Sequence, residues 1–124
     1  MKIYYYSMTG NCESFLKHTG QSQVENIENV KEVNEPFVIV TGTVKFGETP
    51  EPVLNFLRSH SNYLVGVVSS GNRNWGERFA KAGHNISQEF NVPLLLKFEL
   101  RGQDKDVKLF NERIDQLDKL YRTK

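Results

Sequence analysis

The stretch Pro36-Phe37-Val38-Ile39-Val40-Thr41 decides the fold class of this 124-residue chain. It places four consecutive apolar residues between a proline and a threonine. A strand that is apolar on both faces is typical of a parallel sheet covered by helices on either side, whereas a half-solvated antiparallel strand alternates apolar and polar residues. The stretch therefore predicts a buried strand of an α/β protein.

Strand and helix patterns alternate on both sides of this stretch. We expect further strands at 3–6, 63–68 and 94–98, a short edge strand within 24–33, and helices at 12–18, 50–59, 74–90 and 104–121. Within 104–121, Val107, Phe110 and Ile114 recur at helical spacing. The alternation predicts a doubly wound five-stranded parallel sheet in a three-layer α/β/α sandwich, with one domain over residues 1–124.

Composition narrows the class of partner. Hydrophobic residues make up 38% of the chain and charged residues 25%, as in ordinary globular proteins. The net charge of +1 argues against nucleic acid or an anionic membrane as the main partner. The single cysteine excludes an internal disulfide and a Cys-based zinc site, and no stretch approaches the roughly 20 apolar residues of a membrane span. We therefore expect a cytoplasmic protein without a metal site.

The loops that follow the strands are the place to search for a ligand, because open parallel sheets bind ligands beyond the carboxyl ends of their strands. The first loop, Ser7-Met8-Thr9-Gly10-Asn11, runs into a helix near Cys12. Its backbone N–H groups and hydroxyls can hold a phosphate. It lacks the lysine of a P-loop and the glycines of a dinucleotide fingerprint, which favours a terminal phosphomonoester. An ordinary helix cap is the alternative interpretation.

Two later loops combine glycines and small polar residues with one large aromatic each. Such loops suit a planar ligand, because glycine lets the backbone approach and an aromatic ring can stack on the ligand's face. The candidate residues are Thr41, Gly42, Thr43, Phe46 and Gly47 in the second loop and Ser70, Gly71, Asn72, Trp75 and Gly76 in the third. Trp75 could instead pack at a helix start. A phosphate loop followed by two ring-holding loops is the layout of a flavin mononucleotide (FMN) site.

Longer stretches of the chain resemble one family of flavodoxin-like proteins, the NrdI family. The resemblance covers about residues 1–110 and is carried by Pro36–Thr41, by Phe46-Gly47 with Pro50–Val53, by Gly71-Asn72-Arg73-Asn74-Trp75-Gly76 and by Asn91–Leu95 running into Lys97-Phe98-Glu99-Leu100. It implies a flavodoxin-like fold. It also implies that Ser7, Met8, Thr9, Gly10, Asn11 and Cys12 border the phosphate of FMN, and that the other two loops border the ring.

The resemblance further implies a role beside class Ib ribonucleotide reductase. The expected partners are the reductase's small subunit, with its dimanganese or diiron centre, an unidentified flavin reductant and dioxygen. Reduced flavin would react with dioxygen to give superoxide or a peroxide-level oxidant, which assembles the dimanganese-tyrosyl radical cofactor. No catalytic side chain is expected, because the flavin carries the chemistry. The expected docking face is the rim around Lys45–Glu51 and Arg73–Arg78.

Other interpretations stay open at this point. A general electron-transfer flavodoxin is the main alternative, although such carriers are usually strongly acidic and this chain is not. A flavodoxin-like domain without a cofactor is another. A phosphorelay receiver would need acidic residues where this chain has Tyr5-Tyr6-Ser7. Cys12 could have a lowered pKa at the helix N-terminus, but a small core residue is the favoured interpretation.

Overall fold

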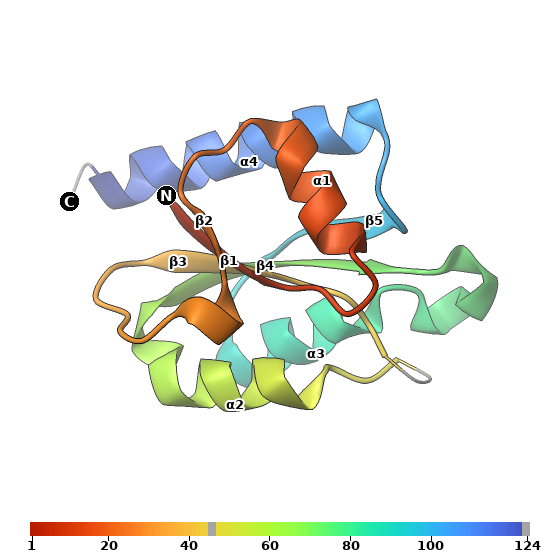
Figure 1. Cartoon of the computed structure of the whole chain (residues 1–124), viewed down its shortest axis with the longest axis horizontal. Helices are drawn as coiled ribbons and strands as arrows, with labels where there is room; N and C mark the ends of the chain where they lie inside the picture. Colours follow the sequence, from red (N-terminus) through yellow and green to blue (C-terminus); the bar gives the residue numbers. More distant parts are fainter. Residues whose placement is uncertain (45–46, 123–124) are drawn as a thin grey trace.

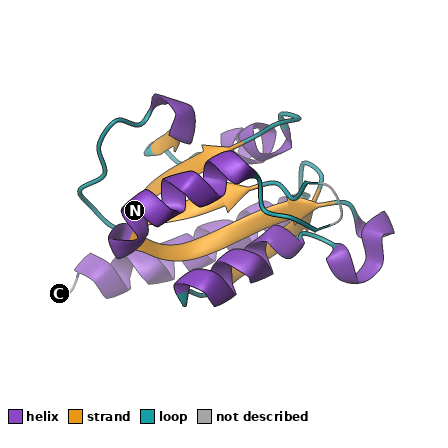
Figure 2. Cartoon of the chain, turned by 90° about the horizontal axis from the view of Figure 1, so that it is seen from below, coloured by secondary structure: helices purple, strands orange, loops and turns teal. Residues whose placement is uncertain are grey.

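The computed structural model describes residues 1–44 and 47–122 and contains one sheet between two layers of helices (Figures 1 and 2). The strands are β1 (Lys2–Tyr6), β2 (Val24–Asn26), β3 (Phe37–Thr41), β4 (Leu64–Gly71) and β5 (Leu94–Glu99). The α-helices are α1 (Asn11–Thr19), α2 (Glu51–His60), α3 (Lys81–Phe90) and α4 (Asp104–Arg122). Short 3-10 helices are η1 (Ile27–Asn29), η2 (Ser61–Tyr63) and η3 (Arg73–Arg78).

The sheet has the order β2-β1-β3-β4-β5, and every neighbouring pair is parallel. The chain first adds β2 on one side of β1 and then adds β3 on the other side, so the winding reverses between β1 and β3. This strand order is the flavodoxin-like one, and a ligand site is expected where the winding reverses. The predicted five-stranded parallel sheet and three-layer fold are confirmed.

The apolar stretch at β3 is buried on both faces because each face supports its own core. Phe37 and Ile39 contribute to the core under α2 and α3, whereas Val38 and Val40 contribute to the core under α1 and α4. All of β3 is buried. In Figure 1, α1 and α4 lie on one side of the sheet and α2 and α3 on the other. The central strand is therefore fixed from both sides, and so are the loops at its carboxyl end.

The short edge strand expected within 24–33 is confirmed: it is β2, Val24–Asn26, and η1 follows it. Two other expected boundaries were wrong. The helix expected at 74–90 is split into η3 and α3, because Gly76 has φ 58° and Ala80 has φ 50°, values that no α-helix contains. β4 continues through Gly71, so Ser69 and Ser70 pair with β5 as strand residues and do not start a loop.

Candidate functional site

The first loop joins β1 to the N-terminus of α1. Gly10 is the N-cap residue, and no side chain caps this end of the helix. The hydroxyl of Ser7 is buried and has no hydrogen-bond partner. A buried hydroxyl without a partner is costly, and N–H groups at an open helix N-terminus attract anions. The loop therefore has both features that a bound phosphate would satisfy.

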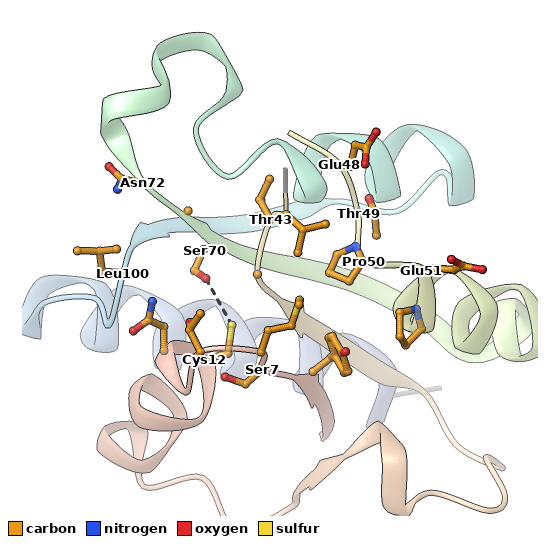
Figure 3. Close-up of a pocket in the computed structure, with 18 of the residues that line it drawn as sticks. Ser7, Cys12, Thr43, Glu48, Thr49, Pro50, Glu51, Ser70, Asn72 and Leu100 are labelled. Atoms are coloured by element: carbon orange, nitrogen blue, oxygen red, sulfur yellow. Dashed lines mark hydrogen bonds between the residues drawn. The ribbon is translucent and has the colours of Figure 1, made fainter. Parts of the chain in front are cut away.

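Cys12 and Ser70 link the first loop to β4. The Cys12 sulfur and the Ser70 hydroxyl lie 3.4 Å apart within hydrogen-bond range (Figure 3). Burial raises the pKa of the Cys12 thiol to about 11, and the contact with Ser70 lowers it only in part. The thiol is therefore protonated at neutral pH. The idea of a lowered pKa at this helix N-terminus was wrong, and Cys12 is a buried core residue.

The second loop follows β3 and turns back toward α2. The backbone of Val44 pairs with that of Glu48, with N···O distances of 2.9 Å in both directions. The hydroxyl of Thr43 accepts a hydrogen bond from the Ala82 backbone at 3.2 Å, which attaches the loop to α3. The hydroxyl of Thr49 is buried without a hydrogen-bond partner. Like the Ser7 hydroxyl, it is a polar group that the protein alone does not satisfy.

The third loop begins after Gly71 and runs through η3. A Cβ atom at Gly71 would lie 2.5 Å from the Ala80 backbone nitrogen, so only glycine allows this close approach. The Asn72 side chain accepts a hydrogen bond from the Asn74 backbone at 2.9 Å and so shapes the start of η3. Trp75 lies on this segment and is 38% exposed. The loop is therefore held at both ends and presents an aromatic side chain.

A cavity of about 700 Å³ lies between these loops at the carboxyl edge of the sheet, within the size range of cofactor sites. Figure 3 shows its lining, with Ser7 and Cys12 on one side and Thr43, Thr49 and Pro50 on another. The expected site residues that line it are Ser7, Met8, Thr9, Asn11, Cys12, Gly42, Thr43, Ser70, Gly71, Asn72 and Trp75. Three loops far apart in the sequence thus share one cavity.

Other expected site residues lie elsewhere. Thr41 is buried in β3, and its hydroxyl donates to the Gly42 carbonyl at 2.9 Å. Gly10, Gly47 and Gly76 do not line the cavity, although Gly10 shapes the loop that does. Gly47 is a buried residue of the second loop, and its carbonyl accepts a hydrogen bond from the Asn85 side chain at 3.0 Å. Phe46, the aromatic expected to stack from this loop, lies outside the described residues.

Sequence reasoning missed several lining residues. They are Tyr6, Val44, Glu48, Thr49, Pro50, Glu51, Pro52 and Leu100. Leu100 directly follows β5, so it belongs to a further strand-end loop at the same edge and could have been found by the rule used for the other loops. The segment Glu48–Pro52 ends the second loop and begins α2, and its place at the cavity depends on how that loop folds back.

The described residues contain neither a metal-binding cluster nor a membrane-spanning helix. Within residues 1–44 and 47–122, no group of three or more His, Cys, Asp or Glu side chains could hold a metal ion. Across the same residues, no helix is both long enough and apolar enough to cross a membrane. The cavity is lined by hydroxyls, by the side-chain amides of Asn11 and Asn72, by apolar side chains and by two acids, Glu48 and Glu51.

The strand order, the cavity at the switch point and the open helix end define a flavodoxin-like protein. A family model described as NrdI flavodoxin-like matches residues 3–112, so the chain belongs to the NrdI flavodoxin-like family. The chain is also 48% identical over 121 residues to Protein NrdI of Macrococcus caseolyticus strain JCSC5402, with 98% of this chain and 94% of that protein covered.

A solved structure supports the fold independently. The structure of a short-chain flavodoxin associated with a non-canonical PDU bacterial microcompartment superimposes with a TM-score of 0.74, covering 96% of each chain. The two sequences are 21% identical, so this likeness concerns the fold alone. The resemblance seen in the sequence is thus confirmed at the level of both family and fold.

Proposed function

We propose that this protein binds FMN and, in its reduced state, supplies an oxidant to the small subunit of a class Ib ribonucleotide reductase. The observation that carries the proposal is the buried, unpartnered Ser7 hydroxyl beside an open helix N-terminus, in a chain of the NrdI family. A phosphate group would accept hydrogen bonds from both features. Burial of the ring between the loops would follow from the position of the phosphate.

The residues that would hold FMN come from all three loops. Ser7, Thr9 and Asn11 would contact the phosphate, which explains why no side chain caps α1. Gly42, Thr43, Gly71 and Asn72 would border the ring through their backbones, with Trp75 against its face. Thr49 would offer its buried hydroxyl to a polar atom of the ligand. When bound, FMN supplies electron transfer to dioxygen, which gives superoxide or a peroxide-level oxidant.

The protein itself would hold the ring of FMN in one orientation and keep a negatively charged thiol away from it. The Cys12 thiol, whose pKa is raised to about 11, stays neutral beneath the cavity, so it brings no negative charge toward the ligand. The second loop is attached to α3 through Thr43, and the third loop approaches α3 closely at Gly71. Two rigidly placed loops would keep the ring in one orientation. The redox-active metal would belong to the reductase subunit.

The test has two parts, each with its own readout. Purified apoprotein is titrated with FMN and followed by quenching of flavin fluorescence, with a stoichiometry of one FMN per chain expected. The reduced holoprotein is then mixed with dioxygen and the manganese-loaded small subunit, and tyrosyl radical is measured by electron paramagnetic resonance. FMN binding without radical formation would favour a general electron-transfer flavodoxin. Absence of FMN binding would contradict the proposal entirely.

A further inference from the structure

A second cavity adjoins the cofactor cavity at the turn between β5 and α4. Its volume is about 400 Å³, and it shares Asn11 and Leu100 with the first cavity. Its walls come mainly from residues 99–106. The two cavities therefore lie side by side at the carboxyl edge of the sheet, where they meet at Asn11 and Leu100.

The two acids that line the second cavity, Glu99 and Asp106, are already engaged by neighbouring groups. Glu99 accepts a hydrogen bond from the Arg73 backbone at 3.1 Å and pairs with the Arg73 side chain at 3.6 Å. Asp106 is engaged with the backbone N–H of Gln103 at 2.8 Å. Both acids are therefore occupied by groups of the cavity itself.

Two cations of this cavity have no acidic partner. Arg101 and Lys105 are exposed, and neither forms an ion pair with any residue in the ranges 1–44 and 47–122. Arg73, in contrast, is already held by Glu99 and lies with its guanidinium 4.5 Å from the centre of the Phe79 ring. The positive charge available to a ligand is therefore that of Arg101 and Lys105.

A large apolar side chain is exposed beside these cations. Leu100 directly precedes Arg101, lines both cavities and is 48% exposed. Leu100 also has φ 53°, a backbone conformation that glycine or asparagine adopts at lower cost, and its N–H donates to the Gly71 carbonyl at 3.0 Å. An exposed leucine in a strained conformation serves neither solubility nor stability, which points to a binding role.

We propose that Leu100, Arg101 and Lys105, together called the β5–α4 surface, dock an acidic segment of the partner protein. An apolar side chain of that segment covers Leu100, and its carboxylates reach Arg101 and Lys105. A small anion would neutralise the cations and leave the exposed Leu100 side chain in water, so a protein segment fits the observations better. This inference rests on the proposed function, which identifies the partner as the reductase's small subunit.

The β5–α4 surface is not the docking face expected from the sequence, which was the rim around Lys45–Glu51 and Arg73–Arg78. That expectation used Lys45, which lies outside the described residues, and Arg73, which is engaged with Glu99 and Phe79. β5 lies beyond β4 in the strand order, so the β5–α4 surface lies on the opposite side of the third loop from the second loop. Asn11 of the proposed phosphate loop lines both cavities. A partner docked there would still border the mouth of the proposed FMN site.

The experiment measures binding of the FMN-loaded protein to the manganese-loaded small subunit by biolayer interferometry. The double variant Arg101→Glu/Lys105→Glu should lower the association rate constant about tenfold or more at low ionic strength, because charges at an interface rim act mainly on association. Its FMN affinity should stay unchanged. Leu100→Asn, which tolerates the positive φ, should raise the dissociation rate constant.

The matched control is Lys17→Glu/Lys119→Glu, which changes the charge equally near the C-terminal ends of α1 and α4. Retained binding by this control together with loss in the first double variant would support the proposal. Equal binding by wild type and both double variants would overturn it while leaving the proposed function intact. Loss of FMN affinity in Arg101→Glu/Lys105→Glu would overturn it too, since the cations would then serve the cofactor. Wild-type protein that does not bind the small subunit would refute both proposals.

Discussion

Replacing Ser7 by alanine should change stability and cofactor affinity in opposite directions. The Ser7 hydroxyl is buried and makes no hydrogen bond within the protein. In the cofactor-free protein it therefore carries an uncompensated desolvation cost, which the Ser7→Ala variant removes. In the FMN-bound protein the same hydroxyl would donate to the phosphate, and the variant loses that bond. A hydroxyl with a purely structural role would not produce this opposition.

The expected magnitudes follow from the burial of this one atom. An unsatisfied buried polar group costs about 1–3 kcal/mol, so the free energy of unfolding of the apoprotein should rise by about 1 kcal/mol. A hydrogen bond to a charged group contributes about 1.5–3 kcal/mol, so the dissociation constant for FMN should rise by about 10-fold to 150-fold. Urea denaturation followed by circular dichroism measures the first quantity, and fluorescence quenching measures the second.

Riboflavin separates a phosphate contact from a general disturbance, because it has the same ring and lacks the phosphate. Ser7→Ala should leave riboflavin affinity unchanged. The matched variant is Thr49→Val, which removes the other buried unpartnered hydroxyl from the second loop while keeping its shape. It should weaken FMN and riboflavin alike. Equal losses of both ligands in Ser7→Ala, or a less stable apoprotein, would refute the assignment of Ser7 to the phosphate.

Three further predictions concern stability. Burial raises the pKa of the Cys12 thiol from 9.0 to about 11, so the contribution of the thiol to stability is complete below pH 9 and is lost as the pH rises to 11. Over this pH range Cys12→Ala should therefore lose up to about 3 kcal/mol less free energy of unfolding than wild type, as measured by urea titrations. Gly71→Ala should lower the free energy of unfolding by about 1–3 kcal/mol or more, because the added Cβ would lie 2.5 Å from the Ala80 backbone. In Gly20→Ala the added Cβ meets no atom within 4 Å, so this variant should lose about 1–2 kcal/mol from its positive φ alone. Equal losses for the two variants in denaturant titrations would contradict the clash at Gly71. Phe15→Ala should cost about 3–5 kcal/mol, since the ring is wholly buried, and a loss below 1 kcal/mol by calorimetry would contradict its place in the core.

Local sequence was sufficient where one residue type left a single structural choice. Gly20 ends α1 in the left-handed conformation, which glycine adopts at low cost. The apolar run at β3 left burial on both faces as the single choice, and every residue of β3 is buried in the structure. The helix expected at 74–90 failed because its apolar spacing continued across Gly76 and Ala80, where the backbone turns out of the helix. The close approach of Gly71 to Ala80 accompanies that break, and no local pattern reveals it.

The same contrast holds for the site. Sequence alone determined the strand-end loops, their glycines and hydroxyls and the family, because turn chemistry and apolar periodicity are properties of short segments. Only the tertiary structure decided that Cys12 contacts Ser70 across 58 positions of the chain, that the hydroxyls of Ser7 and Thr49 are buried without partners, and that Leu100 joins two cavities. Burial and long-range contact depend on how distant segments pack together, and the sequence of one segment does not specify which other segments will lie next to it.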